Sequence, residues 1–187
     1  MTASRRPPSD GGSARLFFAA WPEPGIQQAL YELARRAQGE CGGRAIAARK
    51  IHLTLAFLGS FERARLDALE ALAAGIAGAP CDLVLTRVDH FRKSRIVWAG
   101  AERSPGALSA LAAALAQALR AIDVRVDERP YVPHVTLLRD ARRGPERTGT
   151  DPIVWGVRDF ALVESAQRGR ERVYEVLRRW PLRSGSI

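Results

Sequence analysis

Two copies of one four-residue pattern decide how this chain is interpreted: His52-Leu53-Thr54-Leu55 and His134-Val135-Thr136-Leu137. They use two of the three histidines in the chain. In an extended strand, successive side chains point to opposite faces, so each copy places its histidine and threonine on one face, about 6.5 Å apart along the strand. The aliphatic residues face the other way and anchor the strand in a core. Two such strands brought together predict a polar pocket with four functional groups.

Hydrophobic periodicity and turn residues predict the elements around these two strands. Gly59 and Ser60 are expected to end the first motif strand, and the Arg, Gly and Pro residues of 142–152 are expected to form a loop. The alternation of strands and helices favours an α+β or α/β fold, with two similar lobes and a cleft between them. The expected strands are 15–20, 50–58, 82–88, 95–99, 132–138, 157–164 and 172–180, and the expected helices are 24–38, 62–76 and 104–122.

The 187 residues are enough for one domain with its own core, which we place at 15–182 between an N-terminal disordered tail (1–14) and a short C-terminal tail (183–187). Cys41 and Cys81 have neither the number nor the spacing of a disulfide framework or a zinc site. No apolar run reaches membrane-spanning length and the N-terminus lacks a signal-peptide core. We therefore expect a cytoplasmic monomer that does not associate with membranes.

The net charge of +9 favours polyanionic partners such as RNA. The basic residues are almost all arginine, which fits the composition of a GC-rich genome as well as it fits a nucleic-acid surface. A group of arginines in the C-terminal part could line an RNA path or form an ordinary solvated surface. This group comprises Arg142, Arg143, Arg147, Arg168, Arg170 and Arg172.

Paired histidines suit phosphodiester cleavage without a metal ion. One imidazole can act as a base on the attacking oxygen and the other as an acid on the departing oxygen, because a pKa near 6.5 makes both forms accessible. Thr54 and Thr136 can donate hydrogen bonds to the non-bridging oxygens. No carboxylate cluster accompanies them, so we expect no metal and no cofactor. The rate should then depend on pH in a bell shape.

Arg139 follows His134 by five positions, and its guanidinium can bind a phosphate through two hydrogen bonds. The matching position after His52 is Phe57, so the two motifs differ in chemistry. Phe17 and Phe18 are adjacent, so one should face the core and the other the opposite side, where it could stack on a base. His90 has no comparable context and is interpreted as structural.

With these residues the chain resembles the two-histidine (2H) phosphoesterase superfamily, and within it the RNA 2′,3′-cyclic phosphodiesterase family, also called 2′-5′ RNA ligases. The resemblance spans about residues 15–182. It rests on the two motifs and on flanking blocks: RLFFA (15–19), HLTLAFLG (52–59), RIVW (95–98), PHVTLLRD (133–140), 160–165 and RWPL (179–182).

The resemblance implies an α+β fold that is bilobal, a pseudo-twofold pair of antiparallel-sheet lobes with outer helices and a central cleft. It implies hydrolysis of a terminal RNA 2′,3′-cyclic phosphate to a 2′-phosphate. His52 and His134 become the acid and base, Thr54, Thr136 and Arg139 bind the phosphate, and Phe18 becomes a pocket-side aromatic. We favour His134 as the base that activates water and His52 as the acid.

Three alternatives remain open from the sequence. The reverse reaction would join RNA ends through a 2′-5′ linkage, and the same site could act on cyclic nucleotides or ADP-ribose cyclic phosphate. The chain could also be a noncatalytic RNA-binding module, although affinity alone does not need the doubled histidine and threonine. Turnover of a nucleoside 2′,3′-cyclic phosphate in EDTA separates the enzyme from the module.

Overall fold

The computed structural model describes residues 12–169 and 171–183. Its helices are α1 (Pro24–Cys41), α2 (Leu66–Ala74) and α3 (Gly106–Arg120), with 3₁₀ turns η1 (Ala48–Lys50) and η2 (Arg63–Arg65). Its strands are β1 (Ser13–Ala20), β2 (Arg44–Ala45), β3 (Leu53–Glu62), β4 (Cys81–Phe91), β5 (Ile96–Gly100), β6 (His134–Arg139), β7 (Gly149–Val157), β8 (Asp159–Arg168) and β9 (Glu171–Pro181).

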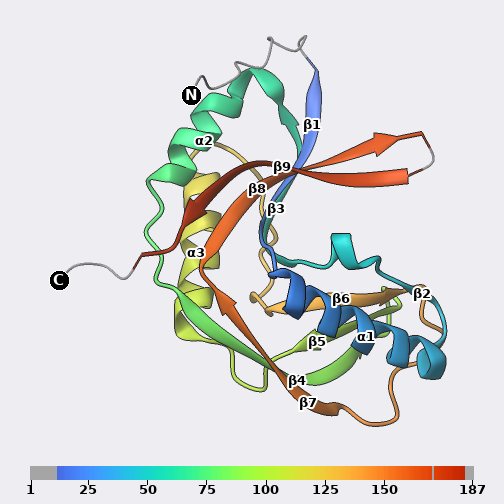
Figure 1. The fold of residues 1–187 in the computed structure, drawn as a ribbon. Coiled ribbons are helices and arrows are strands. Elements are labelled where there is room, and N and C mark those ends of the chain that lie inside the picture. Colours follow the sequence, from blue (N-terminus) through green and yellow to red (C-terminus); the bar gives the residue numbers. More distant parts are fainter. Residues whose placement is uncertain (1–11, 170, 184–187) are drawn as a thin grey trace.

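The two motif strands meet in the middle of one antiparallel sheet, whose order is β7-β4-β5-β6-β3-β1-β8-β9. β3 and β6 pair only at Leu53 and Val135, and β2 pairs with β6. Counted outward from this junction, each half has four strands in matching order, β3-β1-β8-β9 and β6-β5-β4-β7. Figure 1 shows these halves as two lobes that diverge from the centre. The α+β fold and its two antiparallel-sheet lobes are thus confirmed.

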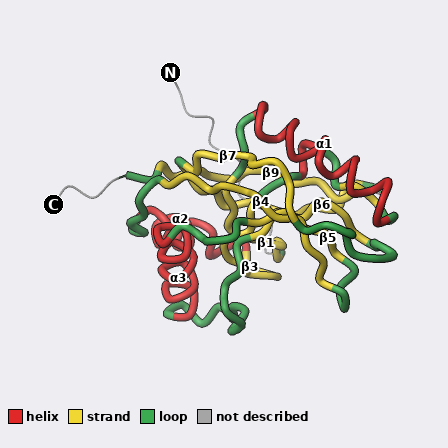
Figure 2. Tube along the Cα trace, turned by 90° about the horizontal axis from the view of Figure 1, so that it is seen from below, coloured by secondary structure: helices red, strands yellow, loops and turns green. Residues whose placement is uncertain are grey.

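The outer helices connect the two halves. α1 follows β1 in the chain but packs against β6 and β7 of the other half, while α3 follows β5 and packs against β3. Figure 2 shows α1 on one flank of the sheet and α2 with α3 together on another. Because each half is covered by a helix that follows a strand of the other half, the two motif strands are held as parts of one core.

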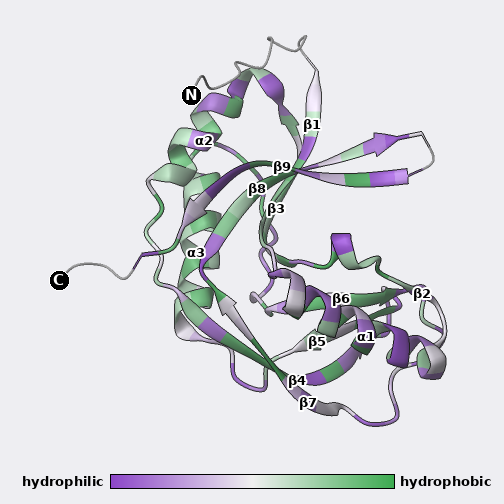
Figure 3. Ribbon diagram, in the orientation of Figure 1, coloured by the Kyte–Doolittle hydropathy of each residue, from purple (hydrophilic) through white to green (hydrophobic). Residues whose placement is uncertain are grey.

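The core is built from the apolar faces of these elements. α1 buries Leu30, Leu33 and Ala34, which recur at helical spacing, and α3 buries Leu108, Leu111 and Leu115 in the same way. Burial of each such leucine stabilises the fold by about 1.5–3 kcal/mol. Figure 3 shows the apolar colour concentrated in α3 and the central strands, and a mixture of polar and apolar colour along the β8–β9 hairpin.

Several expected boundaries were wrong, each for a local reason. β3 does not end at Gly59 and Ser60 but continues to Glu62, because Gly59 has a φ of 75° beside an irregularity in the β1–β3 pairing. β7 was missed because Pro152 and Gly149 indicate a loop. Its proline is tolerated because β7 lies at the edge of the sheet in the described part of the chain. The helix expected at 62–76 is reduced to η2 and the nine residues of α2.

The chain termini are described only in part. Ser13 and Ala14, which the sequence placed in the tail, belong to β1, where Ser13 pairs with Glu62. Of the expected C-terminal tail only Arg183 is described, and its amide donates to the Gly78 carbonyl over 2.9 Å. Gly12 is also described, and its carbonyl accepts from the Arg63 amide over 3.0 Å, whereas residues 1–11 and 184–187 lie outside the described part. None of the helices described has the length and apolar character needed to cross a membrane.

Candidate active site

The junction of β3 and β6 brings the four motif side chains onto one face of the sheet. Leu53 is directly opposite Val135, so the antiparallel register places His52 opposite Thr136 and Thr54 opposite His134. Opposite residues share a face and lie about 5 Å apart at Cβ, while neighbours along one strand on that face are about 6.5 Å apart. By this register the histidines lie on one diagonal across the junction and the threonines on the other.

Both imidazoles are held by the same backbone contact. His52 Nδ1 donates to the Lys50 carbonyl over 2.7 Å, and His134 Nδ1 donates to the Val132 carbonyl over 2.8 Å. A carbonyl can only accept, so the hydrogen of each neutral ring is on Nδ1 and Nε2 carries the free lone pair. Each ring thus presents Nε2 as the atom that takes up or gives away a proton.

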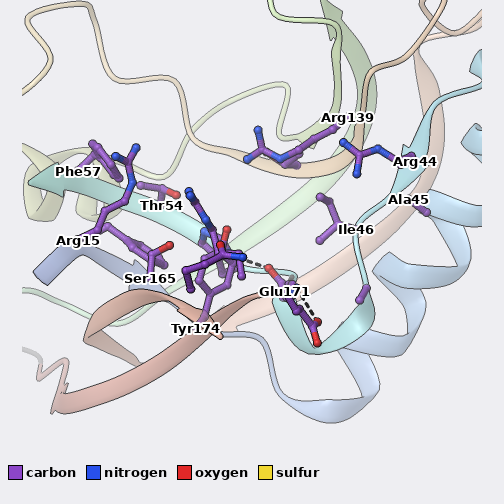
Figure 4. A pocket seen from close by; sticks show the side chains of 17 residues that line it. Arg15, Arg44, Ala45, Ile46, Thr54, Phe57, Arg139, Ser165, Glu171 and Tyr174 are labelled. Atoms are coloured by element: carbon purple, nitrogen blue, oxygen red, sulfur yellow. Dashed lines mark hydrogen bonds and ion pairs between the residues drawn. The ribbon is translucent and has the colours of Figure 1, made fainter. Parts of the chain in front are cut away.

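A cavity of about 750 Å³ opens beside these groups. His52, Thr54, Thr136 and Arg139 line it, whereas His134 is not among its lining residues. Figure 4 shows Arg139 and Arg44 across the space from Arg15, Ser165 and Tyr174. The lining contains five cationic side chains, Arg15, Arg44, Lys50, Arg139 and Arg172, and one anionic side chain, Glu171. This charge balance suits an anionic ligand.

His52 is enclosed by aromatic rings. Trp21 stacks on it with ring centroids 5.0 Å apart and planes 13° apart, Phe17 lies at 5.0 Å, and Tyr174 meets it edge-on at 5.2 Å. This burial lowers the pKa of His52 to about 4 against the opposing effect of its bond to Lys50, and the charges of Arg139 and His134 lower it further. His52 is therefore neutral at pH 7.

His134 has a more open environment. Phe91 meets its ring edge-on at 5.1 Å and Trp98 lies at 6.1 Å, with no ring stacked on it among the described residues. Burial lowers the pKa of His134 as well, and its bond to Val132 opposes this shift. The charge of His134 is the smallest of the contributions that lower the pKa of His52.

Arg139 and Phe57, the matching positions of the two motifs, both line the cavity. Arg139 lines the cavity from the end of β6, next to Gly43, where a Cβ would come within 2.6 Å of the Arg139 carbonyl oxygen. Gly43 has a φ of 84° and so lets β2 approach this strand end. Phe57 is 42% exposed and carries the Arg15 guanidinium 4.7 Å above its ring.

Phe18 was assigned wrongly. Its side chain is 0% exposed and packs against Phe160 and Trp180 in the core, so it cannot face a ligand. Phe17 lines the cavity and contacts His52 instead. The alternation along β1 indicated that one of the pair faces the pocket, but which one depends on the register of β1 with β3 and β8.

Sequence reasoning did not identify Trp21, Tyr174 or Lys50, which surround or orient His52. The sequence gives little indication of these contacts, because Trp21 and Tyr174 come from segments that are far from the His52 motif in sequence. Of the six arginines considered as an RNA path, Arg172 lines the cavity and Arg170 lies outside the described residues. Within residues 12–169 and 171–183, no three histidine, cysteine or acidic side chains gather as a set that could hold a metal ion.

Comparison with known proteins agrees with this fold and site. The structure resembles one described as a phosphoesterase, with a TM-score of 0.86 and 31% identity over 92% of this chain and 99% of that one. It also resembles Escherichia coli LigT complexed with 3′-AMP, with a TM-score of 0.84 and 32% identity over 91% and 98% of the two chains. The fold is thus that of a phosphoesterase.

The family follows from the sequence matches. The profile of the 2′-5′ RNA ligase superfamily matches residues 22–169. The RNA 2′,3′-cyclic phosphodiesterase of Escherichia coli K12 is 37% identical over 174 residues, which cover 90% of this chain and 96% of that protein. The chain belongs to the 2′-5′ RNA ligase superfamily, as the paired motifs predicted.

Proposed function

We propose that this protein hydrolyses the 2′,3′-cyclic phosphate at the end of an RNA to a 2′-phosphate, with His52 and His134 as the acid and base. The observation that carries this proposal is the pair of matched imidazoles, each anchored through Nδ1, on one face of the β3–β6 junction. The cationic cavity beside them and the named activity of the Escherichia coli relative support the substrate class.

The reaction needs one proton to be taken up and one to be given away. Water attacks phosphorus while a neutral imidazole Nε2 takes its proton, and the bond from phosphorus to O3′ breaks as the second, protonated imidazole gives its proton to O3′. Thr54, Thr136 and Arg139 hold the non-bridging oxygens, whose charge must be stabilised in the transition state. The product carries a 2′-phosphate and a free 3′-hydroxyl.

Burial lowers the pKa of both imidazoles, to about 4 for His52, and so favours the neutral form of each ring. The assignment favoured from sequence, His134 as base and His52 as acid, stays a prediction. A substrate with sulfur at the 3′ leaving position separates this assignment from the reverse one, since a thiolate departs without a proton and restores activity only to the variant that lacks the acid.

The family description also supports a second candidate, 2′-5′ ligation, in which a 5′-hydroxyl RNA end attacks phosphorus in place of water, the bond from phosphorus to O3′ breaks and O3′ takes up the proton. Water at about 55 M outcompetes a free RNA end unless that end is held in place. Hydrolysis is therefore the direction we propose for a single bound RNA.

The test is incubation with uridine 2′,3′-cyclic phosphate in EDTA, with the product identified by ³¹P NMR. We expect uridine 2′-phosphate from the native protein and none from His52→Ala or His134→Ala. If the native protein binds RNA but produces no phosphomonoester, the proposed enzymatic function is wrong and the chain is a noncatalytic RNA-binding module.

A further inference from the structure

A strip of polar side chains continues from the candidate active site across the β1 half of the sheet. Arg15 pairs with Ser60 on β3, and the register of β1 with β8 places Ser165 on its other side. One step further along β8, Gln167 pairs with Arg172 on β9. Opposite residues share a face, so these side chains lie on the face that carries Phe17 and the cavity. We call Arg15, Ser60, Ser165, Gln167 and Arg172 the polar strip.

The polar strip joins two cavities. Arg15, Ser165 and Gln167 line both the cavity beside His52 and a second one of about 480 Å³. The second cavity reaches Ser13, at the start of β1, and Ser60, near the end of β3. The three shared side chains therefore mark a continuous path that leads away from the catalytic groups along the surface of the sheet.

Arg15 brings a charge to this path that no carboxylate neutralises within the described residues. Three other cations nearby are paired: Arg44 binds Asp140, Lys50 binds Glu171 over 2.9 Å, and Arg63 binds the buried Glu164. Arg15 instead lies over Phe57, which occupies one face of its guanidinium and leaves the N–H groups at the edge free to donate. Such a guanidinium is suited to bind a phosphate through two hydrogen bonds.

The position of Arg15 separates this charge from the reacting phosphate. Thr54 is paired with Ala19, four residues from Arg15, which is about 13 Å along β1. The Arg15 side chain lies over Phe57, three residues beyond Thr54, so its guanidinium stands between the reacting centre and the second cavity. A second phosphate could bind there while the first lies between the histidines.

We infer that Arg15 binds the phosphodiester on the 5′ side of the reactive nucleotide and that the RNA strand continues along the polar strip into the second cavity. This inference rests on the proposed function and specifies its substrate: an RNA strand rather than a free cyclic nucleotide. Ser165 and Gln167 can donate to the strand beyond Arg15, and Arg172 adds a cation at the far edge.

The test compares two substrates with the same reactive end, uridine 2′,3′-cyclic phosphate and the dinucleotide UpU ending in a 2′,3′-cyclic phosphate. The native enzyme should have the higher kcat/KM on the dinucleotide. In Arg15→Gln the ratio of kcat/KM for the dinucleotide to that for the mononucleotide should fall about tenfold, as expected for the loss of a charge-assisted hydrogen bond. Most of the change should be in KM.

Arg36→Gln is the matched control, because Arg36 is exposed on α1, outside both cavities, and its loss changes the net charge equally. The ratio in this variant should equal the native one. A ratio in Arg15→Gln that stays within twofold of the Arg36→Gln value overturns the inference. Arg15→Lys should recover part of the dinucleotide-to-mononucleotide ratio of kcat/KM, since lysine keeps the positive charge but cannot donate two parallel hydrogen bonds to one phosphate.

A binding measurement keeps the inference separate from catalysis. Fluorescence anisotropy with 5′-labelled pentauridylate that ends in a 2′-phosphate gives the slope of log Kd against log salt. One phosphate contact contributes about 0.7 to this slope for a single strand, so Arg15→Gln should lower it by about that amount relative to Arg36→Gln. If Arg15→Gln lowers the slope although the native protein turns over neither substrate, the inferred RNA path is supported and the proposed function is wrong. If Arg15→Gln and Arg36→Gln have equal slopes, the inferred RNA path is wrong.

Discussion

The β3 half and the β6 half present the same motif with the same ring anchor, yet they surround it differently. His52 has Trp21 stacked on it and two more aromatic rings in contact, whereas His134 has two edge-on rings and Arg139 five residues later. The repeat thus sets the local geometry of both imidazoles. Their surroundings come from segments that are not repeated, and these give the two histidines different proton affinities.

The largest effect should come from removal of either imidazole. We expect His52→Ala and His134→Ala each to lower kcat by about 10³-fold, within the range for loss of a general acid or base. The double variant should be little worse than either single variant, because both groups act in one transition state. Steady-state kinetics with uridine 2′,3′-cyclic phosphate checks this, and far-UV circular dichroism controls for folding. A single variant within tenfold of native kcat would contradict the paired mechanism.

The next effect separates Arg139 from its counterpart Phe57. Arg139→Ala should lower kcat/KM by about 10- to 100-fold, since it removes hydrogen bonds from a charged donor to the phosphate. Phe57→Ala on the same mononucleotide substrate should cost less, because its ring supplies no charge to the phosphate. If the two losses are equal, the distinction between the motifs does not extend to phosphate binding.

The threonines should have a smaller and more equal effect. Thr54→Val and Thr136→Val keep the side-chain shape and remove one hydroxyl donor each, so we expect about a tenfold fall in kcat/KM for either. Thr54→Ser and Thr136→Ser, which keep the hydroxyl, are the matched controls. Loss in the serine variants as large as in the valine variants would mean that packing, rather than the hydroxyl, matters.

The smallest effect concerns the aromatic enclosure of His52. A lowered histidine pKa means that the neutral form persists to lower pH, so the acid limb of kcat/KM should fall near pH 4 and the optimum should lie below 6.5. Trp21→Ala admits water to His52 and should raise its pKa, which moves the acid limb upward. NMR titration of the His52 ring checks the same shift directly, with Phe91→Ala as the control at His134. An unmoved His52 titration would show that Trp21 does not set this pKa.

Particular residues show how much of the fold and of the candidate site the sequence predicts. His52, Thr54, Thr136 and Arg139 were predicted to share a pocket and all line one cavity, whereas His134, predicted to join them, is not among its lining residues. Phe18 was chosen in place of Phe17, because alternation along a strand does not say which face meets the ligand. The edge strand β7 was missed because its glycine and proline favour a loop locally, and only pairing with β4 makes it a strand.

By itself, the sequence determined that each histidine shares a strand face with a threonine, and that this doubled pair suits proton transfer at a phosphate. Both conclusions depend on the two-residue period of a strand and on side-chain chemistry, which are local properties. The enclosure of His52 by Phe17, Trp21 and Tyr174 and the place of Arg15 in the cavity lining depend on the folded chain. These contacts depend on the register between strands distant in the chain, which short-range periodicity does not encode.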